Sequence, residues 1–306
     1  MRSLLLMLCC LALPLSAAPL RLQLQQQDAQ LLFRYQFDIA GAPQQLAFNI
    51  DNASLNNHFR QFRAFKAALL QQYLWRDLRA HVARYPTAKL SRLPGNTVLR
   101  YRLQAPTELA AQLDSELQQL LQQQTDAYLQ REYYYQLGLP WGEQVIVPDH
   151  QRLMQDSLTA LLPVANALHP KLVNMTLRQS LAYISHWLQQ IPYQDLSDRQ
   201  RSAGASFSPP LKLLQENRGD CDSKTVLLAA LIRMLLPDVK LAIIYLPQHA
   251  MLAAHLPLQA DDSSVTLDGR EYLLLDPTGP ALLAPGQISP EYRIYTHNAQ
   301  FAYRLL

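Results

Sequence analysis

A polar turn runs directly into an apolar helix in the stretch Asn217-Arg218-Gly219-Asp220-Cys221-Asp222-Ser223-Lys224-Thr225, which continues without a polar residue over 226–232. The sequence predicts that this helix begins at Cys221. At a helix N-terminus the free backbone N–H groups and the helix dipole favour a thiolate over a thiol. Cys221 is therefore our candidate nucleophile, and the alternative is a small buried residue without chemistry.

The first residues predict export. Arg2 precedes an apolar stretch over 4–13, and the small residues of 14–18 follow, which is the pattern of a secretory signal cleaved after residue 17. Cys9 and Cys10 lie inside this signal, so Cys221 is left without a partner and cannot be a disulfide staple. We expect a periplasmic or secreted protein; the alternative is an uncleaved signal anchor. The later apolar run over 226–236 is too short to span a bilayer and contains Arg233.

Length and charge set further bounds. A chain of 306 residues suggests two domains, and we expect a strand-and-long-helix domain over 18–147 and a second domain over 148–306. The formal net charge is +3, and the basic residues are scattered along the sequence, so nothing indicates a nucleic-acid partner.

The apolar periodicity gives different elements in the two halves. In the first half we expect antiparallel strands within 20–50, one long helix from residue 52 to about 86, a strand over 98–103, a second long helix from 107 and a break at 138–142. In the second half we expect helices over 151–168, 176–190, 211–215 and from 221 to Pro237, then strands over 241–246, 249–256 and 270–275. A Cys-bearing helix packed against an antiparallel sheet is an α+β arrangement.

Four segments in this order resemble a known family. They are Gln189-Gln190-Ile191-Pro192-Tyr193, the Arg218-Gly219-Asp220-Cys221-Asp222 turn, His249 at a strand start, and Leu275-Asp276-Pro277-Thr278 at a strand end. Together they resemble the transglutaminase-like cysteine enzyme superfamily, in particular its bacterial periplasmic cysteine peptidases. The resemblance covers about 150–285 and implies a papain-like core, in which the Cys helix packs on the sheet that presents His and Asp.

Thiol chemistry assigns a role to each residue. A thiolate attacks a carbonyl, an imidazole moves the proton, and a carboxylate fixes the imidazole ring. We expect Cys221 as nucleophile, His249 as acid and base, and Asp276 as the orienting carboxylate. His255 competes with His249 because it shares the strand face, and Asp276 could instead end a strand before Pro277. For the oxyanion we favour the Cys221 backbone N–H and expect Gln215 to be ordinary helix surface.

The same turn raises the question of a metal. Calcium-dependent proteases in one branch of the superfamily carry acidic residues on both sides of the nucleophile, which makes Asp220 and Asp222 calcium candidates by resemblance. We favour the alternative in which Asp220 caps the helix and Asp222 interacts with its dipole. We expect no metal site and no cofactor, and a zinc site lacks a second cysteine.

The expected function is an exported cysteine peptidase or amidase that acts on a protein or peptide of the cell envelope. One alternative is a protein-glutamine acyltransferase that cross-links its substrates, and another is a non-catalytic adaptor on the same fold. The sequence leaves the oligomeric state open.

Overall fold

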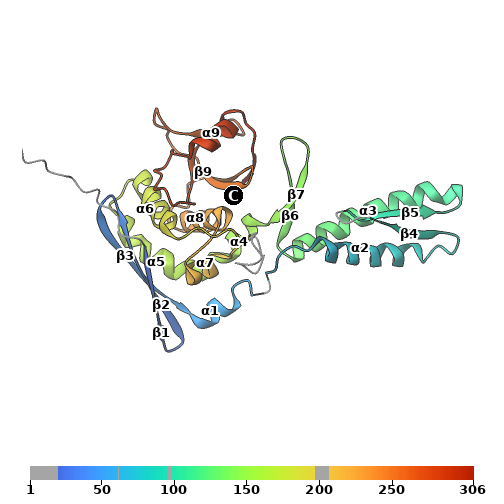
Figure 1. The fold of residues 1–306 in the computed structure, drawn as a ribbon, viewed down its shortest axis with the longest axis horizontal. Helices are drawn as coiled ribbons and strands as arrows, with labels where there is room; N and C mark the ends of the chain where they lie inside the picture. The colour runs from blue at the N-terminus through green and yellow to red at the C-terminus, as the bar shows by residue number, and fades with distance from the viewer. Residues whose placement is uncertain (1–19, 61, 95–97, 197–206) are drawn as a thin grey trace, which may run out of the picture.

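The computed structural model describes residues 20–60, 62–94, 98–196 and 207–306. The predicted export signal over 1–17 lies outside these ranges. The expected α+β class is confirmed, because helices surround one antiparallel sheet in the C-terminal half (Figure 1). In the described part of the chain, no helix combines the length and the apolar character needed to cross a membrane.

The Cys helix is the centre of the body. This helix, α8 (Cys221–Leu235), has its ten residues from Ser223 to Ile232 buried. It packs against a five-stranded sheet in the order β10-β11-β9-β8-β12, with all neighbours antiparallel. The strands are β8 (Leu241–Leu246), β9 (His249–Ala254), β10 (Ser264–Leu267), β11 (Arg270–Leu275) and β12 (Ala302–Leu305).

The two faces of this sheet bury different side chains. Ile243 and Leu252 belong to the cluster that contains α8, whereas Ile244 and Met251 belong to a second cluster with Tyr292 of α9 (Pro290–His297). Side chains alternate between the two faces of a strand, so a strand that is covered on both faces needs apolar residues at successive positions. This is the pattern of β8 and of β9 after His249. The sequence analysis did not anticipate β10, β12 or α9.

Four further helices and a second sheet complete the body. The helices are α4 (His150–Ser157), α5 (Leu162–Leu172), α6 (Leu177–Gln190) and α7 (Pro210–Glu216), with a 3-10 turn over Thr159–Leu161. The second sheet contains β1 (Arg21–Gln27), β2 (Gln30–Ile39) and β3 (Ala42–Asp51) in sequence order.

This N-terminal sheet shares its core with the C-terminal half. The Tyr35 ring meets Trp187 of α6 edge-on at 5.3 Å, and the Tyr35 hydroxyl donates to the Leu214 carbonyl at 2.8 Å. Phe33 and Phe48 lie in the same buried cluster as α8. The expected boundary at residue 148 therefore does not divide the hydrophobic core, because β1–β3 need the C-terminal helices to cover their apolar face.

Part of the N-terminal half forms an arm that projects from the body (Figure 1). It consists of α2 (Ala67–Val82), α3 (Thr107–Arg131) and the hairpin of β4 (Lys89–Leu93) and β5 (Arg100–Gln104). Leu78, Val82, Leu113 and Leu117 form a buried cluster of their own within it.

The single long helix that we expected over 52–86 is wrong. The structure has α1 (Asn52–Asn57), a non-helical connection and then α2. Phe59 takes a positive φ of 48°, and Phe62 stacks on Tyr134 at 5.6 Å. The apolar side chains of this segment have the spacing of a continuous helix face, but in the structure they pack where the arm meets the body. Tertiary packing thus overrides the local periodicity.

A hairpin links the arm to the body. It is formed by β6 (Tyr134–Gly138) and β7 (Gln144–Pro148), where the sequence suggested only a chain break. Tyr134 and Ile146 lie on one face and join a cluster of the arm, and Leu137 and Val145 lie on the other and join the body core. Because both faces of the hairpin carry apolar residues that pack into different cores, its strands lack the alternation of apolar and polar residues that identifies a strand from sequence.

Replacing Trp187 by alanine should destabilise the whole body, because Trp187 is fully buried between α6 and the N-terminal sheet. We expect a loss of about 3–5 kcal/mol in the free energy of unfolding, measured by chemical denaturation. Trp141→Ala is the matched control, since Trp141 is 52% exposed at the β6–β7 turn and should change stability by less than about 1 kcal/mol. Equal losses in the two variants would show that the N-terminal sheet is not part of this core.

Candidate active site

Cys221 opens into a cleft of about 770 Å³ between the start of α8, the β8–β9 turn and the β6–β7 hairpin. His249 lines the same cleft, and apolar side chains of the hairpin form one wall. The lining of the cleft includes Trp141, Val145, His150, Tyr193, Asp222 and Tyr245.

The turn before α8 fixes the position of Cys221. Asp220 is the helix cap, and its carboxylate accepts a hydrogen bond from the Ser223 backbone N–H at 3.3 Å. Gly219 donates to the Pro192 carbonyl at 3.2 Å and accepts from the Gln194 backbone N–H at 3.0 Å. The turn is thus tied to the segment after α6, and Cys221 is the first helical residue, as the sequence predicted.

The surroundings of the Cys221 sulfur act against the thiolate form. Burial raises the pKa of the Cys221 thiol, and the carboxylates of Asp222 and Asp220 raise it further. The backbone N–H of Ala250, next to His249, works in the opposite direction through a hydrogen bond to the sulfur. Burial and the two carboxylates therefore offset the effect of the helix N-terminus, and attack by Cys221 requires a base, as expected for a thiol paired with an imidazole.

His249 and Asp276 meet at the edge of this cleft. Strands β9 and β11 pair with Leu252 opposite Leu275, which brings the start of one strand to the end of the other. His249 Nε2 lies 3.0 Å from Asp276 Oδ2. With Nε2 engaged, Nδ1 is the ring nitrogen left for proton exchange with a nucleophile.

The Asp276 carboxyl is stabilised in its charged form. Burial by itself raises its pKa, but hydrogen bonds from His249 and from the Thr278 backbone N–H, the latter at 3.0 Å, lower it below its ordinary value. Asp276 is therefore an acceptor from His249 as well as a turn residue before Pro277. The competing His255 is exposed and bonds to the Glu271 carbonyl at 2.8 Å, away from this pair.

Tyr292 covers the imidazole and was missed by the sequence analysis. Its ring stacks on His249 with centroids 4.1 Å apart and planes 3° from parallel. Burial raises the pKa of Tyr292 to about 12, and Asp276 and Cys221 both contribute to this rise. Tyr292 therefore covers one face of the His249 ring and shields it from solvent on that side.

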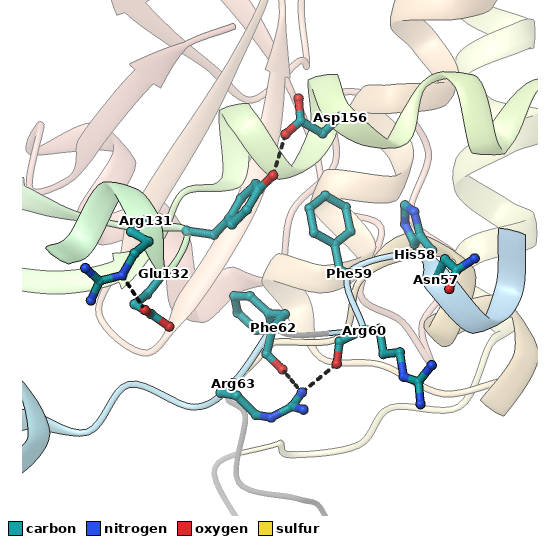
Figure 2. Close-up of a pocket in the computed structure, with 10 residues that line it drawn as sticks. Asn57, His58, Phe59, Arg60, Phe62, Arg63, Arg131, Glu132 and Asp156 are labelled. Carbon is teal, nitrogen blue, oxygen red and sulfur yellow. Dashed lines mark hydrogen bonds and ion pairs between the residues drawn. The ribbon is translucent and has the colours of Figure 1, made fainter. Parts of the chain in front are cut away.

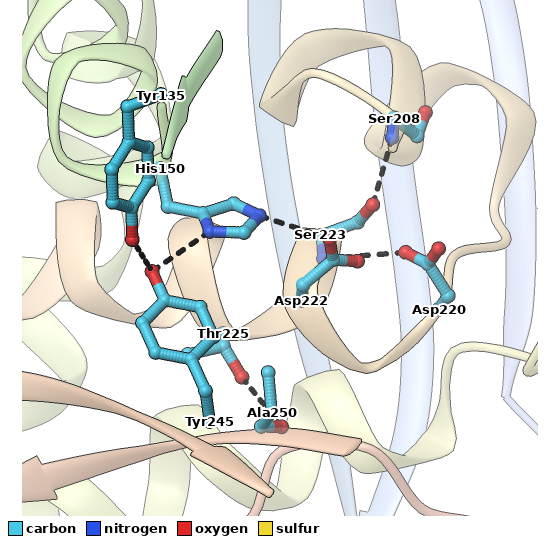
Figure 3. A network of polar contacts seen from close by, with 9 residues as sticks. All are labelled: Tyr135, His150, Ser208, Asp220, Asp222, Ser223, Thr225, Tyr245 and Ala250. Carbon is cyan, nitrogen blue, oxygen red and sulfur yellow. Dashed lines mark hydrogen bonds and ion pairs between the residues drawn. The ribbon is translucent and has the colours of Figure 1, made fainter. Parts of the chain in front are cut away.

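A second histidine–carboxylate pair, His150 and Asp222, involves the residue next to Cys221 in the chain (Figure 3). His150 Nε2 lies 2.9 Å from Asp222, and its Nδ1 lies 2.9 Å from the Tyr245 hydroxyl, which accepts from the Tyr135 hydroxyl at 3.0 Å. Burial lowers the pKa of His150 to about 4. Since both of its nitrogens are engaged, His150 holds Asp222 in place and has no nitrogen left for the thiol.

Buried polar side chains anchor the Asp276 loop. Lys224, one turn after Cys221 on α8, donates to the carbonyls of Ile191 and Thr278, each at 2.5 Å. Gln189 of α6 donates to the Asp276 carbonyl at 2.7 Å. Burial lowers the pKa of Lys224 to about 8. Through these bonds α6 and α8 fix the segment that carries the carboxylate. Gln215 is exposed on α7 and does not line the cleft.

The two calcium candidates have other interactions. Burial raises the pKa of Asp220 well above its ordinary value, and the neighbouring Asp222 adds to this. Asp222 is bonded to His150. Over the ranges that the structure describes, no three His, Cys, Asp or Glu side chains gather closely enough to hold a metal ion.

A larger hollow of about 1240 Å³ lies where the arm meets the body (Figure 2). Several of its charged groups have local partners: Arg131 pairs with Glu132 at 3.0 Å, and Asp156 accepts from the Tyr133 hydroxyl at 2.8 Å. Arg63 donates to nearby backbone carbonyls. Its lining contains no cysteine, so the thiol chemistry belongs to the smaller cleft.

Asp222→Asn should move the pH profile of Cys221 alkylation to lower pH. A carboxylate beside the sulfur disfavours the thiolate, so its removal lowers the thiol pKa, by on the order of one pH unit. Iodoacetamide labelling rates across pH, read by mass spectrometry, give the profile. The exposed Asp261→Asn variant should keep the wild-type profile. A profile for Asp222→Asn that is unchanged, or moved to higher pH, would contradict this electrostatic account.

Comparison with known proteins adds no family to this geometry. No protein-family model matches the chain, and no curated protein matches it either. The functional assignment therefore depends on the residues of the cleft and on the chemistry that they can perform.

Proposed function

We propose that the protein is a transglutaminase-like thiol hydrolase, a cysteine peptidase or amidase that forms an acyl-enzyme on Cys221. The observation that carries the proposal is the 3.0 Å hydrogen bond between His249 and Asp276 at the wall of the cleft into which Cys221 opens. The packing of the Cys helix against β9, which begins with His249 and pairs with the strand that ends just before Asp276, supports a papain-like core.

The proposed reaction begins with a neutral thiol. His249 Nδ1 takes the proton from Cys221 as the sulfur attacks the carbonyl carbon, because the raised thiol pKa makes a base necessary. Asp276 holds the ring through Nε2 and stabilises the imidazolium. The backbone N–H of Cys221, at the first helical position, is available to the oxyanion.

The intermediate then breaks down in two steps. The C–N bond of the substrate breaks, His249 returns the proton to the leaving amine, and a thioester remains on Cys221. Water, deprotonated by His249, attacks the thioester and restores the thiol. An amine in place of water would give a cross-linking acyltransferase by the same route.

The cleft favours an extended acyl segment with apolar side chains. Trp141, Val145 and Leu137 line it from the hairpin, and the half-exposed Tyr193 stands beside Cys221. Such an open, mainly apolar cleft next to a nucleophile is typical of peptide-binding sites. We further propose that the enzyme works in the periplasm or outside the cell; this rests on the signal-like sequence over 1–17.

One observation favours a second function. Cys221 is only partly exposed, and the pKa of its thiol is raised rather than lowered. An inert thiol of this kind would suit a non-catalytic adaptor on the same fold. The two functions differ in whether His249 accelerates the chemistry of Cys221.

An activated ester separates these two functions without knowledge of the natural substrate. With p-nitrophenyl acetate, the wild type should release p-nitrophenol in a burst and carry an acetyl group on Cys221, detected by mass spectrometry. His249→Ala should slow acylation by about 100-fold or more, because general-base catalysis contributes about that much. Asp276→Asn should slow it to a smaller extent.

His255→Ala is the matched control. This histidine directly follows β9, the strand that begins with His249, but its ring bonds to the Glu271 carbonyl. It should acylate at the wild-type rate, and Cys221→Ala should show no burst. Equal acylation rates in the wild type and His249→Ala would reject the hydrolase and leave the adaptor.

A further inference from the structure

The hairpin of the arm carries only positive charge. Between residues 84 and 107 the sequence contains no aspartate or glutamate, and it contains the basic residues Arg84, Lys89, Arg92, Arg100 and Arg102. The sequence alone shows these residues as scattered. The structure folds all of them except Arg84 into one two-stranded ribbon, β4–β5, on the projecting arm (Figure 1).

The register of the ribbon sorts its side chains into two faces. Leu90 pairs with Leu103, and both pack against the helices of the arm together with Tyr101. On the alternate positions Ser91 pairs with Arg102, and Leu93 pairs with Arg100. Because side chains alternate along a strand, Lys89, Arg100 and Arg102 share the outer face, and all three are exposed.

The outer face has no compensating negative charge. Within the described ranges, no acidic side chain forms an ion pair with Lys89, Arg100 or Arg102. Two acidic residues of α3 interact with the inner side of the arm. Glu116 accepts a hydrogen bond from the Tyr85 hydroxyl at 2.9 Å and lies 2.7 Å from His81, and the charge of Asp114 contributes to the raised pKa of Tyr101. Arg92 points inward and donates to Gln71 at 2.9 Å. Three cations are therefore presented together to solvent.

An apolar side chain precedes these cations. Val98 is 67% exposed, the largest value among the large hydrophobic residues that the structure describes, and it lies two residues before Arg100. The next residue, Leu99, packs into the arm instead. The ribbon thus has an exposed apolar residue shortly before β5 and three cations on the outer face of its strands.

We propose that the outer face of the β4–β5 ribbon docks the arm onto an anionic lipid surface. Lipid headgroups present a diffuse negative charge to Lys89, Arg100 and Arg102, and no shaped groove is required. Val98 enters the boundary between headgroups and acyl chains, while the cations behind it remain at the headgroups. An acidic polypeptide or a nucleic acid would match the charge but would give no favourable environment to Val98.

Vesicle binding tests this proposal with the full chain as cells produce it. The probes are vesicles of phosphatidylcholine alone and vesicles with roughly equal amounts of phosphatidylcholine and phosphatidylglycerol. Co-sedimentation should show tighter binding to the anionic vesicles, and added salt should weaken it. The triple variant Lys89→Gln, Arg100→Gln, Arg102→Gln should lose about 100-fold in affinity, since each cation near an anionic surface contributes about fivefold. Val98→Ser should weaken binding further.

A matched triple variant, Lys171→Gln, Lys212→Gln, Lys240→Gln, removes the same charge from exposed positions on the body. It should bind anionic vesicles like the wild type, and any contribution of residues 1–19 is common to all variants. Circular dichroism of each variant checks that it is folded. Equal losses in the two triple variants, or equal binding of the wild type to both vesicle types, would overturn the proposal. Ribbon-dependent binding to poly-glutamate or DNA without vesicle binding would also overturn it.

Discussion

The burial of the Cys helix is the constraint on which the rest of the structure depends. From Ser223 to Ile232 every residue of α8 is buried, with the five-stranded sheet on one side and α4–α7 on the others. Removing this much apolar surface from water outweighs the cost of burying the helix start, where polar groups need partners. Asp220, Asp222 and Lys224 each have such a partner. The polar groups around the cleft are therefore the same groups that form hydrogen bonds to the buried start of the Cys helix.

Those partners also fix the geometry around Cys221. On one side, Lys224 and Gln189 hold the Asp276 loop, and Asp276 holds His249. On the other, His150 holds Asp222. The two histidines differ in one respect: His150 uses both ring nitrogens, whereas His249 uses Nε2 for the carboxylate. This difference, more than proximity to the cysteine, identifies the histidine that we propose as the base.

Much of this site could be predicted from sequence because its signals are local. A cap residue before an apolar run places Cys221, and a strand start and a strand end place His249 and Asp276. The unpredicted parts depend on distant packing. His150 and Tyr292 lie on helices with no motif of their own, and only the tertiary fold brings them to the cleft.

The same reason explains the errors in the N-terminal half. Phe62 and Phe65 fit a continuous helix face by spacing, but they pack on Tyr134 of the linking hairpin, and the helix is interrupted there. The raised pKa of Cys221 was also not predictable, because it depends on burial by the completed fold. The local sequence pattern identifies helices and strands, whereas tertiary packing determines where they end and burial determines the pKa values of their side chains.

Nitrogen-15 NMR of the histidine rings tests the convergence of sulfur and imidazole most directly. With resonances identified through His249→Gln and His150→Gln, blocking Cys221 by methylthiolation should shift Nδ1 of His249 and leave the Nε2 bond to Asp276 intact. His150 should respond less, since both of its nitrogens are already engaged. An unchanged His249 resonance, or a larger response at His150, would contradict the account.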